Sequence, residues 1–171
     1  PDSLLVESFQ VIPDITVRLD KEYKWGQAQL SAVVPMLSGR DAKGDLILKP
    51  GWGVSASAIV NSWKDGKWYA QGVIGQAISR YFNDLSGNGL DILFDSELKA
   101  YVPLNYGFYG TYEHDWRADL SSNFTLGFVH VEKFSFTPDN AYLEGYSMKV
   151  NTFWNIIEGA KIGGELIWGQ R

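Results

Sequence analysis

The sequence contains no cysteine, which excludes disulfide bonds and cysteine-based zinc sites. It has no apolar run approaching the ~20 residues of a membrane-spanning helix, which excludes only membrane proteins built from helices. No cluster of lysine and arginine is present and the net charge is −5, so a nucleic-acid partner is not expected. The GxSxG, HExxH and P-loop motifs are also missing. We therefore predict neither an enzyme nor a cofactor site.

Aromatic residues and glycine are abundant: 15% of the chain is aromatic, and 18 residues are glycine. Along most of the chain, apolar residues alternate with polar ones, which is the period of a β-strand with one apolar and one polar face. No segment of comparable length has a helical period. Eight segments follow the alternation: residues 14–23, 26–36, 51–61, 67–79, 105–116, 122–133, 146–154 and 160–169.

The connections between these segments also alternate in length. Short turns are expected near residues 24–26, 64–66, 117–119 and 158–159. Long polar loops are expected at about residues 37–50, 81–103 and 134–143. This order collects the long loops at one end of an up-and-down meander, as in outer-membrane barrels with tight periplasmic turns and long extracellular loops. We predict an all-β fold, an antiparallel up-and-down transmembrane β-barrel.

The tryptophans support the same fold because none lies in the middle of a predicted strand. An indole ring favours the membrane–water boundary, since the ring is apolar while its N–H needs a partner. We predict an interfacial aromatic girdle of Trp25, Trp52, Trp63, Trp68, Trp116, Trp154 and Trp168. A soluble barrel or sandwich whose tryptophans cap its core remains the alternative.

In a porin the apolar strand face meets lipid and the polar face lines a channel. The polar faces here carry many small residues and few long charged ones, which suits a water-filled lumen better than a solvent-facing sheet. We predict a pore lining formed by Arg18, Asp20, Gln27, Gln29, Arg80, Glu113, Lys149, Lys161 and Glu165. Such a mixed lining would tune permeation electrostatically. Cross-strand pairing on a wetted face is an equal alternative for each charge.

Two other features of the sequence are candidate catalytic or metal sites. His114 and His130 share the phase of their apolar neighbours, which indicates structural or interfacial histidines rather than catalytic ones. The segment from Asp84 to Asp95 resembles a calcium-binding loop, but it lacks flanking helices and has Asp where glutamate is usual. We interpret it as a turn cluster and predict no metal site.

The stretch GQAISRYFND connects a strand to a long loop. Gly75 to Ser79 are expected to finish the strand, so that Arg80 emerges at the pore mouth. Arg80 then either points into the mouth or pairs with a loop carboxylate such as Asp84, and we favour the pair because it would anchor a loop that narrows the solute path. Tyr81 and Phe82 are expected at the lipid headgroups or at the base of the loop.

Several motifs in the same order resemble the DcaP-like porin family of Gram-negative outer membranes. They are GQAISRYFNDL, GLDILFD, ELKAYVPLNYGFYGTYEHDW, LSSNFTLGFVHVE and GGELIWGQR. The resemblance extends from about Pro13 onward, with Arg80 and Tyr81 matching a strand-ending motif. Residues 77–80 depart from the tighter glycine pattern of that motif. The resemblance implies a sixteen-stranded trimeric barrel that passes small, often anionic solutes such as dicarboxylates.

We accordingly expect residues 1–171 to be a single β-barrel porin domain, without a second domain, and to represent the C-terminal half of a larger barrel. The expected location is the bacterial outer membrane, and the expected partners are the lipid bilayer, small hydrophilic or anionic solutes and two further copies in a homotrimer. Arg18, Lys149 and Lys161 would assist anions. A complete eight-stranded membrane barrel with a structural or adhesive role, and a soluble carbohydrate-binding β-domain, are the alternatives.

Overall fold

The computed structural model describes residues 5–8, 12–41, 44–62 and 65–171. Its main element is an eight-stranded antiparallel sheet in which every strand pairs with its neighbours in the chain. No helix in the described part of the chain is long and apolar enough to cross a membrane. The eight strands are β2 (Ile15–Tyr23), β3 (Gly26–Val34), β6 (Trp52–Ser62), β7 (Gly66–Gln76), β10 (Leu104–Arg117), β11 (Leu120–Val131), β12 (Glu144–Ile157) and β13 (Ala160–Gln170).

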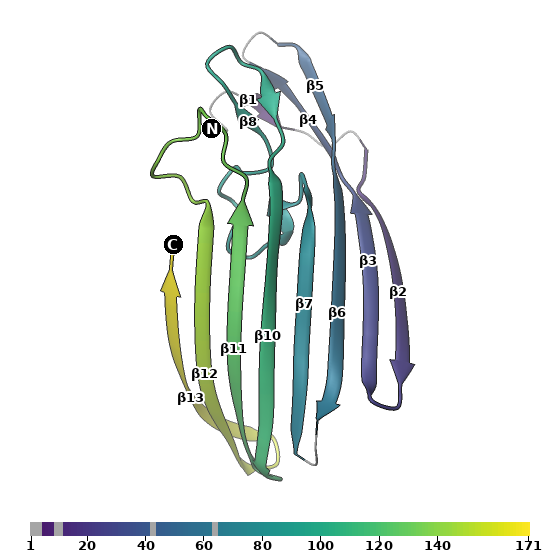
Figure 1. Cartoon of the computed structure of the whole chain (residues 1–171), viewed down its shortest axis with the longest axis vertical. Helices are drawn as coiled ribbons and strands as arrows, with labels where there is room; N and C mark the ends of the chain where they lie inside the picture. The colour runs from purple at the N-terminus through teal and green to yellow at the C-terminus, as the bar shows by residue number, and fades with distance from the viewer. Residues whose placement is uncertain (1–4, 9–11, 42–43, 63–64) are drawn as a thin grey trace.

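The sheet is an up-and-down meander that curves without closing. Its order is β13-β12-β11-β10-β7-β6-β3-β2, so β2 and β13 form its two edges. All the short turns lie at one end and all the long connections at the other (Figure 1). The predicted all-β antiparallel architecture and the sorting of its loops are thus confirmed.

Two smaller sheets stand at the long-loop end, above the main sheet in Figure 1. β1 (Leu5–Ser8), β4 (Met36–Asp41) and β5 (Leu46–Pro50) form one, and β8 (Leu93–Phe94) with β9 (Ala100–Tyr101) forms the other. The long connection predicted at about residues 37–50 is present, but most of it is a β-hairpin formed by β4 and β5, which the sequence pattern did not predict. Pro35, between β3 and β4, has no backbone N–H to extend the ladder.

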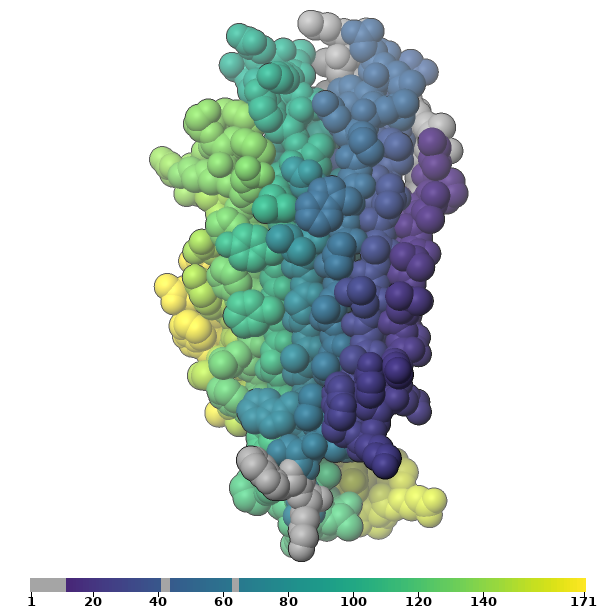
Figure 2. All heavy atoms as spheres, turned by 45° about the vertical axis from the view of Figure 1, so that its right-hand side comes forward, coloured from purple at the N-terminus to yellow at the C-terminus, as the bar shows by residue number. Residues whose placement is uncertain are grey.

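One face of the main sheet is apolar and exposed. The cross-strand register places Val17, Ala32, Val54 and Ile74 in one row of this face. Leu19, Leu126 and Leu166 on the same face are 69%, 47% and 79% exposed, so no protein layer covers it. Figure 2 shows the strands from β2 to β10 as one continuous surface on which aromatic rings are exposed. Such a surface requires an apolar environment.

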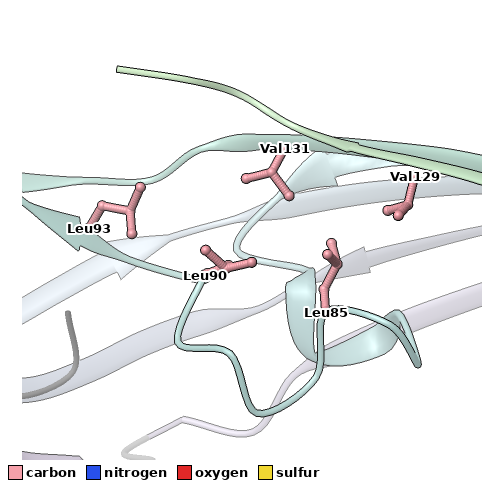
Figure 3. Close-up of a cluster of buried hydrophobic side chains, with 5 residues drawn as sticks. All are labelled: Leu85, Leu90, Leu93, Val129 and Val131. Atoms are coloured by element: carbon pink, nitrogen blue, oxygen red, sulfur yellow. The ribbon is translucent and has the colours of Figure 1, made fainter. Parts of the chain in front are cut away.

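The buried core lies on the opposite, polar face and only at its long-loop end. Leu85, Leu90 and Leu93 of the segment after β7 pack on Val129 and Val131 of β11 (Figure 3). Near the end of β11, the residues that point to the polar face are therefore apolar, because the loop covers them. Residues 77–103 therefore form a loop that folds inward over the polar face, and we call this segment the inward loop.

Candidate pore lining and the inward loop

The inward loop begins three residues earlier than the strand pattern predicts. β7 ends at Gln76, Ala77 has a positive φ of 60°, and Ser79–Tyr81 form a 3-10 helix. The prediction that Gly75 to Ser79 complete a strand is wrong in its last three residues. The left-handed backbone at Ala77 turns the chain off the sheet, and Ala77 and Ile78 become almost completely buried.

Arg80 pairs within the inward loop, as favoured, but with a different carboxylate. Its Nε donates to Oδ2 of Asp91 at 3.2 Å, and its Nη1 lies 3.9 Å from Oδ2 of Asp14. The other oxygen of Asp91 accepts the backbone N–H of Ser79 at 2.8 Å. The expected partner Asp84 is therefore replaced by Asp91, which binds two consecutive residues, Ser79 and Arg80, at the start of the loop. Arg80 is only partly exposed in this network.

Tyr81 extends the same network to the edge of the sheet. Its hydroxyl donates to Oδ2 of Asp14, the residue just before β2. Burial, assisted by the Asp14 hydrogen bond, raises the pKa of Tyr81 to about 12. Phe82 packs at the base of the loop against the buried cluster, whereas the Tyr81 ring stays half exposed over the polar face. Neither side chain lies on the apolar face.

Glycines on the polar face provide the space for the inward loop. A Cβ added to Gly53 would lie 2.9 Å from Cγ2 of Ile78, and one added to Gly107 would lie 3.0 Å from Cε1 of Phe82. Gly145 is similarly covered by Tyr142, from the loop between β11 and β12. At this end of the sheet, small residues admit loop side chains. The expectation that they simply face a water-filled lumen does not apply there.

Nearer the short turns, the polar face carries a row of polar side chains across five strands. The register aligns Lys67, Glu113, Asn123, Asn151 and Glu165. Lys67 lies 3.9 Å from Glu113, Asn123 donates to Asn151 at 2.9 Å, and Asn151 donates to Glu165 at 3.2 Å. These cross-strand pairs fix the side chains of the polar face in position while leaving polar atoms accessible.

The register places the predicted pore-lining residues of the strands on this same polar face. Arg18 donates to Asp20 at 3.1 Å, so the two charges compensate each other. Lys161 lies 4.3 Å from the ring centroid of Phe153. The strand residues concerned are Arg18, Asp20, Gln27, Gln29, Glu113, Lys149, Lys161 and Glu165. Arg80 is the exception because it belongs to the inward loop.

The described tryptophans lie at or near strand ends. Trp25, Trp68, Trp116 and Trp154 are near the short turns, and Trp52 and Trp168 are near the long loops. Three indole N–H groups have partners: Trp52 donates to Gln76, Trp116 to Ser122 and Trp154 to Asp119. Trp63 lies outside the described residues. Their membrane-interface role stays a prediction.

The two histidines lie on the apolar face, consistent with a structural interpretation. His130 Nδ1 is 3.0 Å from Glu144, and His114 stands edge-on to Trp116 with 4.3 Å between ring centroids. In the calcium-like segment, Asp95 accepts the backbone N–H groups of Glu97 and Lys99 at 2.9 Å each. These bonds lower the pKa of Asp95. The described residues contain no cluster of three or more histidine or acidic side chains suited to a metal.

The sequence prediction missed the inward course of residues 77–103 and the partners of several lining residues. Lys67, Tyr69, Asn123 and Asn151 share the polar face, and Tyr69 donates to Glu113 at 3.3 Å. Their strand phase could have identified them. The loop left a further signal, because Val129 and Val131 are apolar residues in the polar phase of β11.

A one-layer, up-and-down β-sheet with an uncovered apolar face and a loop folded onto its polar face is the fold of a transmembrane β-barrel, here unclosed. A solved structure shares this fold: the chain is similar to the crystal structure of the outer membrane channel DcaP of Acinetobacter baumannii. The TM-score is 0.74 at 15% sequence identity, over 95% of this chain and 46% of the channel chain. This chain thus spans about half the channel's length. No family model and no curated protein matches the sequence.

Proposed function

We propose that this chain forms about half of the wall of a bacterial outer-membrane channel through which small hydrophilic solutes diffuse. The observation that carries the proposal is the pairing of two unlike faces on a single sheet. The exposed apolar face suits lipid, and the opposite face is polar except where the inward loop covers it. The likeness to a solved outer-membrane channel supports the same function.

We also propose a contribution to anion passage from β12 and β13. On their polar faces, Lys149 and Lys161 outnumber the single acidic residue Glu165. Arg18 and Arg80, in contrast, are compensated by carboxylates. Any anion preference should therefore depend on the two lysines. Arg18, which was first expected to assist anions as well, is left out of this proposal because its charge is compensated by Asp20.

The test is reconstitution of the channel that contains this chain into planar bilayers. We expect stepwise conductance and, in a KCl gradient, a reversal potential that indicates anion preference. Lys149→Gln and Lys161→Gln should each shift the reversal potential toward cations. Lys21→Gln is the matched control because Lys21 lies on the apolar face beside Tyr23.

Two results would contradict the proposal at different levels. A protein that stays monodisperse in water without detergent and produces no conductance would exclude the channel function. Conductance with no response to either lysine substitution would exclude only the anion contribution. Assembly as a homotrimer is a separate proposal, which chemical cross-linking in native outer membranes would test.

A further inference from the structure

A groove opens on the polar face beside the inward loop, on the side of the sheet formed by β2, β3, β6 and β7. Its volume is about 360 Å³, within the range of ~300–1,000 Å³ common for ligand pockets. Strand residues form its floor, and Ile78 and Tyr81 of the inward loop form part of its wall. The groove therefore lies where the inward loop meets the sheet.

The polar groups of this groove are mostly uncharged. Thr16, Ser31 and Ser55 contribute hydroxyls, and Gln29 and Gln71 contribute amides. Gln71 donates to Ser55 at 3.0 Å, which fixes one amide on the floor. Hydroxyls and amides both donate and accept hydrogen bonds, so this set matches ligands that carry many hydroxyl groups.

The charge of the groove is low. Among the described residues that line the groove, Arg18 alone has a formal charge, and its Nε donates to Asp20 at 3.1 Å. A dianion would meet this compensated pair and no second lining cation. The lysines proposed to assist anions, Lys149 and Lys161, lie on β12 and β13 at the other end of the sheet.

The inward loop adds an aromatic surface to the groove. Tyr81 is 50% exposed, and its hydroxyl is held by Asp14, which restricts the orientation of the ring. Val73 and Ile78 supply further apolar contact beside the ring. Sugars present an apolar C–H face and a rim of hydroxyls, and this combination of ring, amides and hydroxyls complements both.

We propose that this groove is a subsite for a neutral, polyhydroxylated solute of the sugar class. The proposal rests on the channel function for the route by which the solute arrives, but binding itself does not require conduction. The Tyr81 ring contacts the C–H face of the solute, while Gln29 and Gln71 bind its hydroxyls.

The first experiment measures binding to the detergent-solubilised channel protein by saturation-transfer NMR, with maltose and succinate as probes. We expect saturation transfer to maltose and much weaker transfer to succinate. Tyr81→Ala should weaken maltose binding about three- to tenfold, the effect of removing one aromatic contact. Gln29→Ala should also weaken it, without touching the loop network, whereas Gln27→Ala on the same strand face lies outside the groove and should not.

A second experiment records maltose-dependent interruptions of the ionic current in bilayers, with the same variants. Absence of maltose binding in the NMR experiment, succinate binding that Gln29→Ala weakens as much as maltose binding, or an equal effect of Gln27→Ala would overturn the subsite. A protein that binds maltose but does not conduct would retain the subsite and lose the proposed channel function. Conductance without maltose binding would retain the channel function and overturn the subsite.

Discussion

Gly53 determines how closely the inward loop approaches the sheet. A Cβ at this position would lie 2.9 Å from Ile78 and 3.0 Å from Val33, both closer than ordinary van der Waals contact. The Ile78 side chain is 1% exposed, so it has little space into which it could move. The absence of a side chain at Gly53 is therefore one of the features that allow the loop to pack on the sheet.

We therefore predict that Gly53→Ala destabilises the seated loop by about 1–3 kcal/mol, the usual cost of overpacking. Limited proteolysis of residues 77–103 in detergent would measure the change as faster cleavage. Gly164→Ala is the matched control because a Cβ there meets no atom within 4 Å. Equal cleavage of the two variants would contradict the role given to Gly53.

Tyr81 gives the loop network a pH dependence. Its pKa is raised from 10.0 to about 12 in the folded protein, so the folded state keeps the phenol proton where the unfolded chain has lost it. Stability from this group is complete below about pH 10 and is lost as the pH rises towards 12. The urea midpoint of the wild type should fall through this window more than that of Tyr81→Phe. Parallel pH profiles would refute the prediction.

At the scale of elements, the inward loop forms a small buried core against the polar face of the main sheet. Its contacts combine the Arg80–Asp91 pair with apolar packing by Leu85, Leu90 and Leu93. The sequence predicted that Arg80 anchors the loop, but not which carboxylate does so. Asp84 and Asp91 lie in the same polar stretch, and only the folded backbone decides which one reaches Arg80.

Leu85 should contribute most to this packing because it is fully buried. We predict that Leu85→Ala lowers the loop's opening free energy by about 2–5 kcal/mol, through lost contacts and a residual cavity. Amide exchange at Ser86, whose N–H donates to Phe82 at 2.9 Å, should then accelerate at least about thirtyfold. Leu46→Ala, at a position 54% exposed, should leave this amide unchanged. Unchanged exchange in Leu85→Ala would contradict the prediction.

The β4–β5 hairpin shows where strand prediction failed. Ser38, Gly39 and Asp41 are typical loop residues, and they obscure the strand character of a segment that needs no membrane-facing side. Gly44, with a positive φ of 87°, lies between the two strands and marks the reversal. β4 and β5 lie outside the eight-stranded sheet, so they do not share the two unlike faces that give its strands a strong alternation.

For the whole molecule, the eight sheet strands and their faces were predictable from sequence. Alternation is strong because one environment rejects polar groups and the other accepts them. The last segment, predicted at residues 160–169, is observed as Ala160–Gln170. β2 and β13 remain open edges because they do not pair with each other, and a periodic pattern does not encode whether two such distant strands pair.

Depth in the bilayer should determine the cost of a charge on the apolar face. Replacing Leu126, which is half exposed in the middle of β11, by lysine should lower the free energy of unfolding by about 2–4 kcal/mol. Leu120→Lys, beside the short turn, should lower it by only about 0–1 kcal/mol. Urea unfolding from lipid vesicles would measure both. Thr125→Lys, on the polar face, is the control. Equal costs at positions 126 and 120 would argue against a membrane-spanning sheet.

The bond from Tyr81 to Asp14 joins residues 67 positions apart. In the sheet, β3 and β6 separate β2 from β7, so the two residues meet only after all four strands are in register. Contacts between distant parts of a chain form late, once the intervening segments have been ordered. The Tyr81–Asp14 bond therefore forms only after the four strands of the first half of this sheet have paired, so its formation reports that this half is complete.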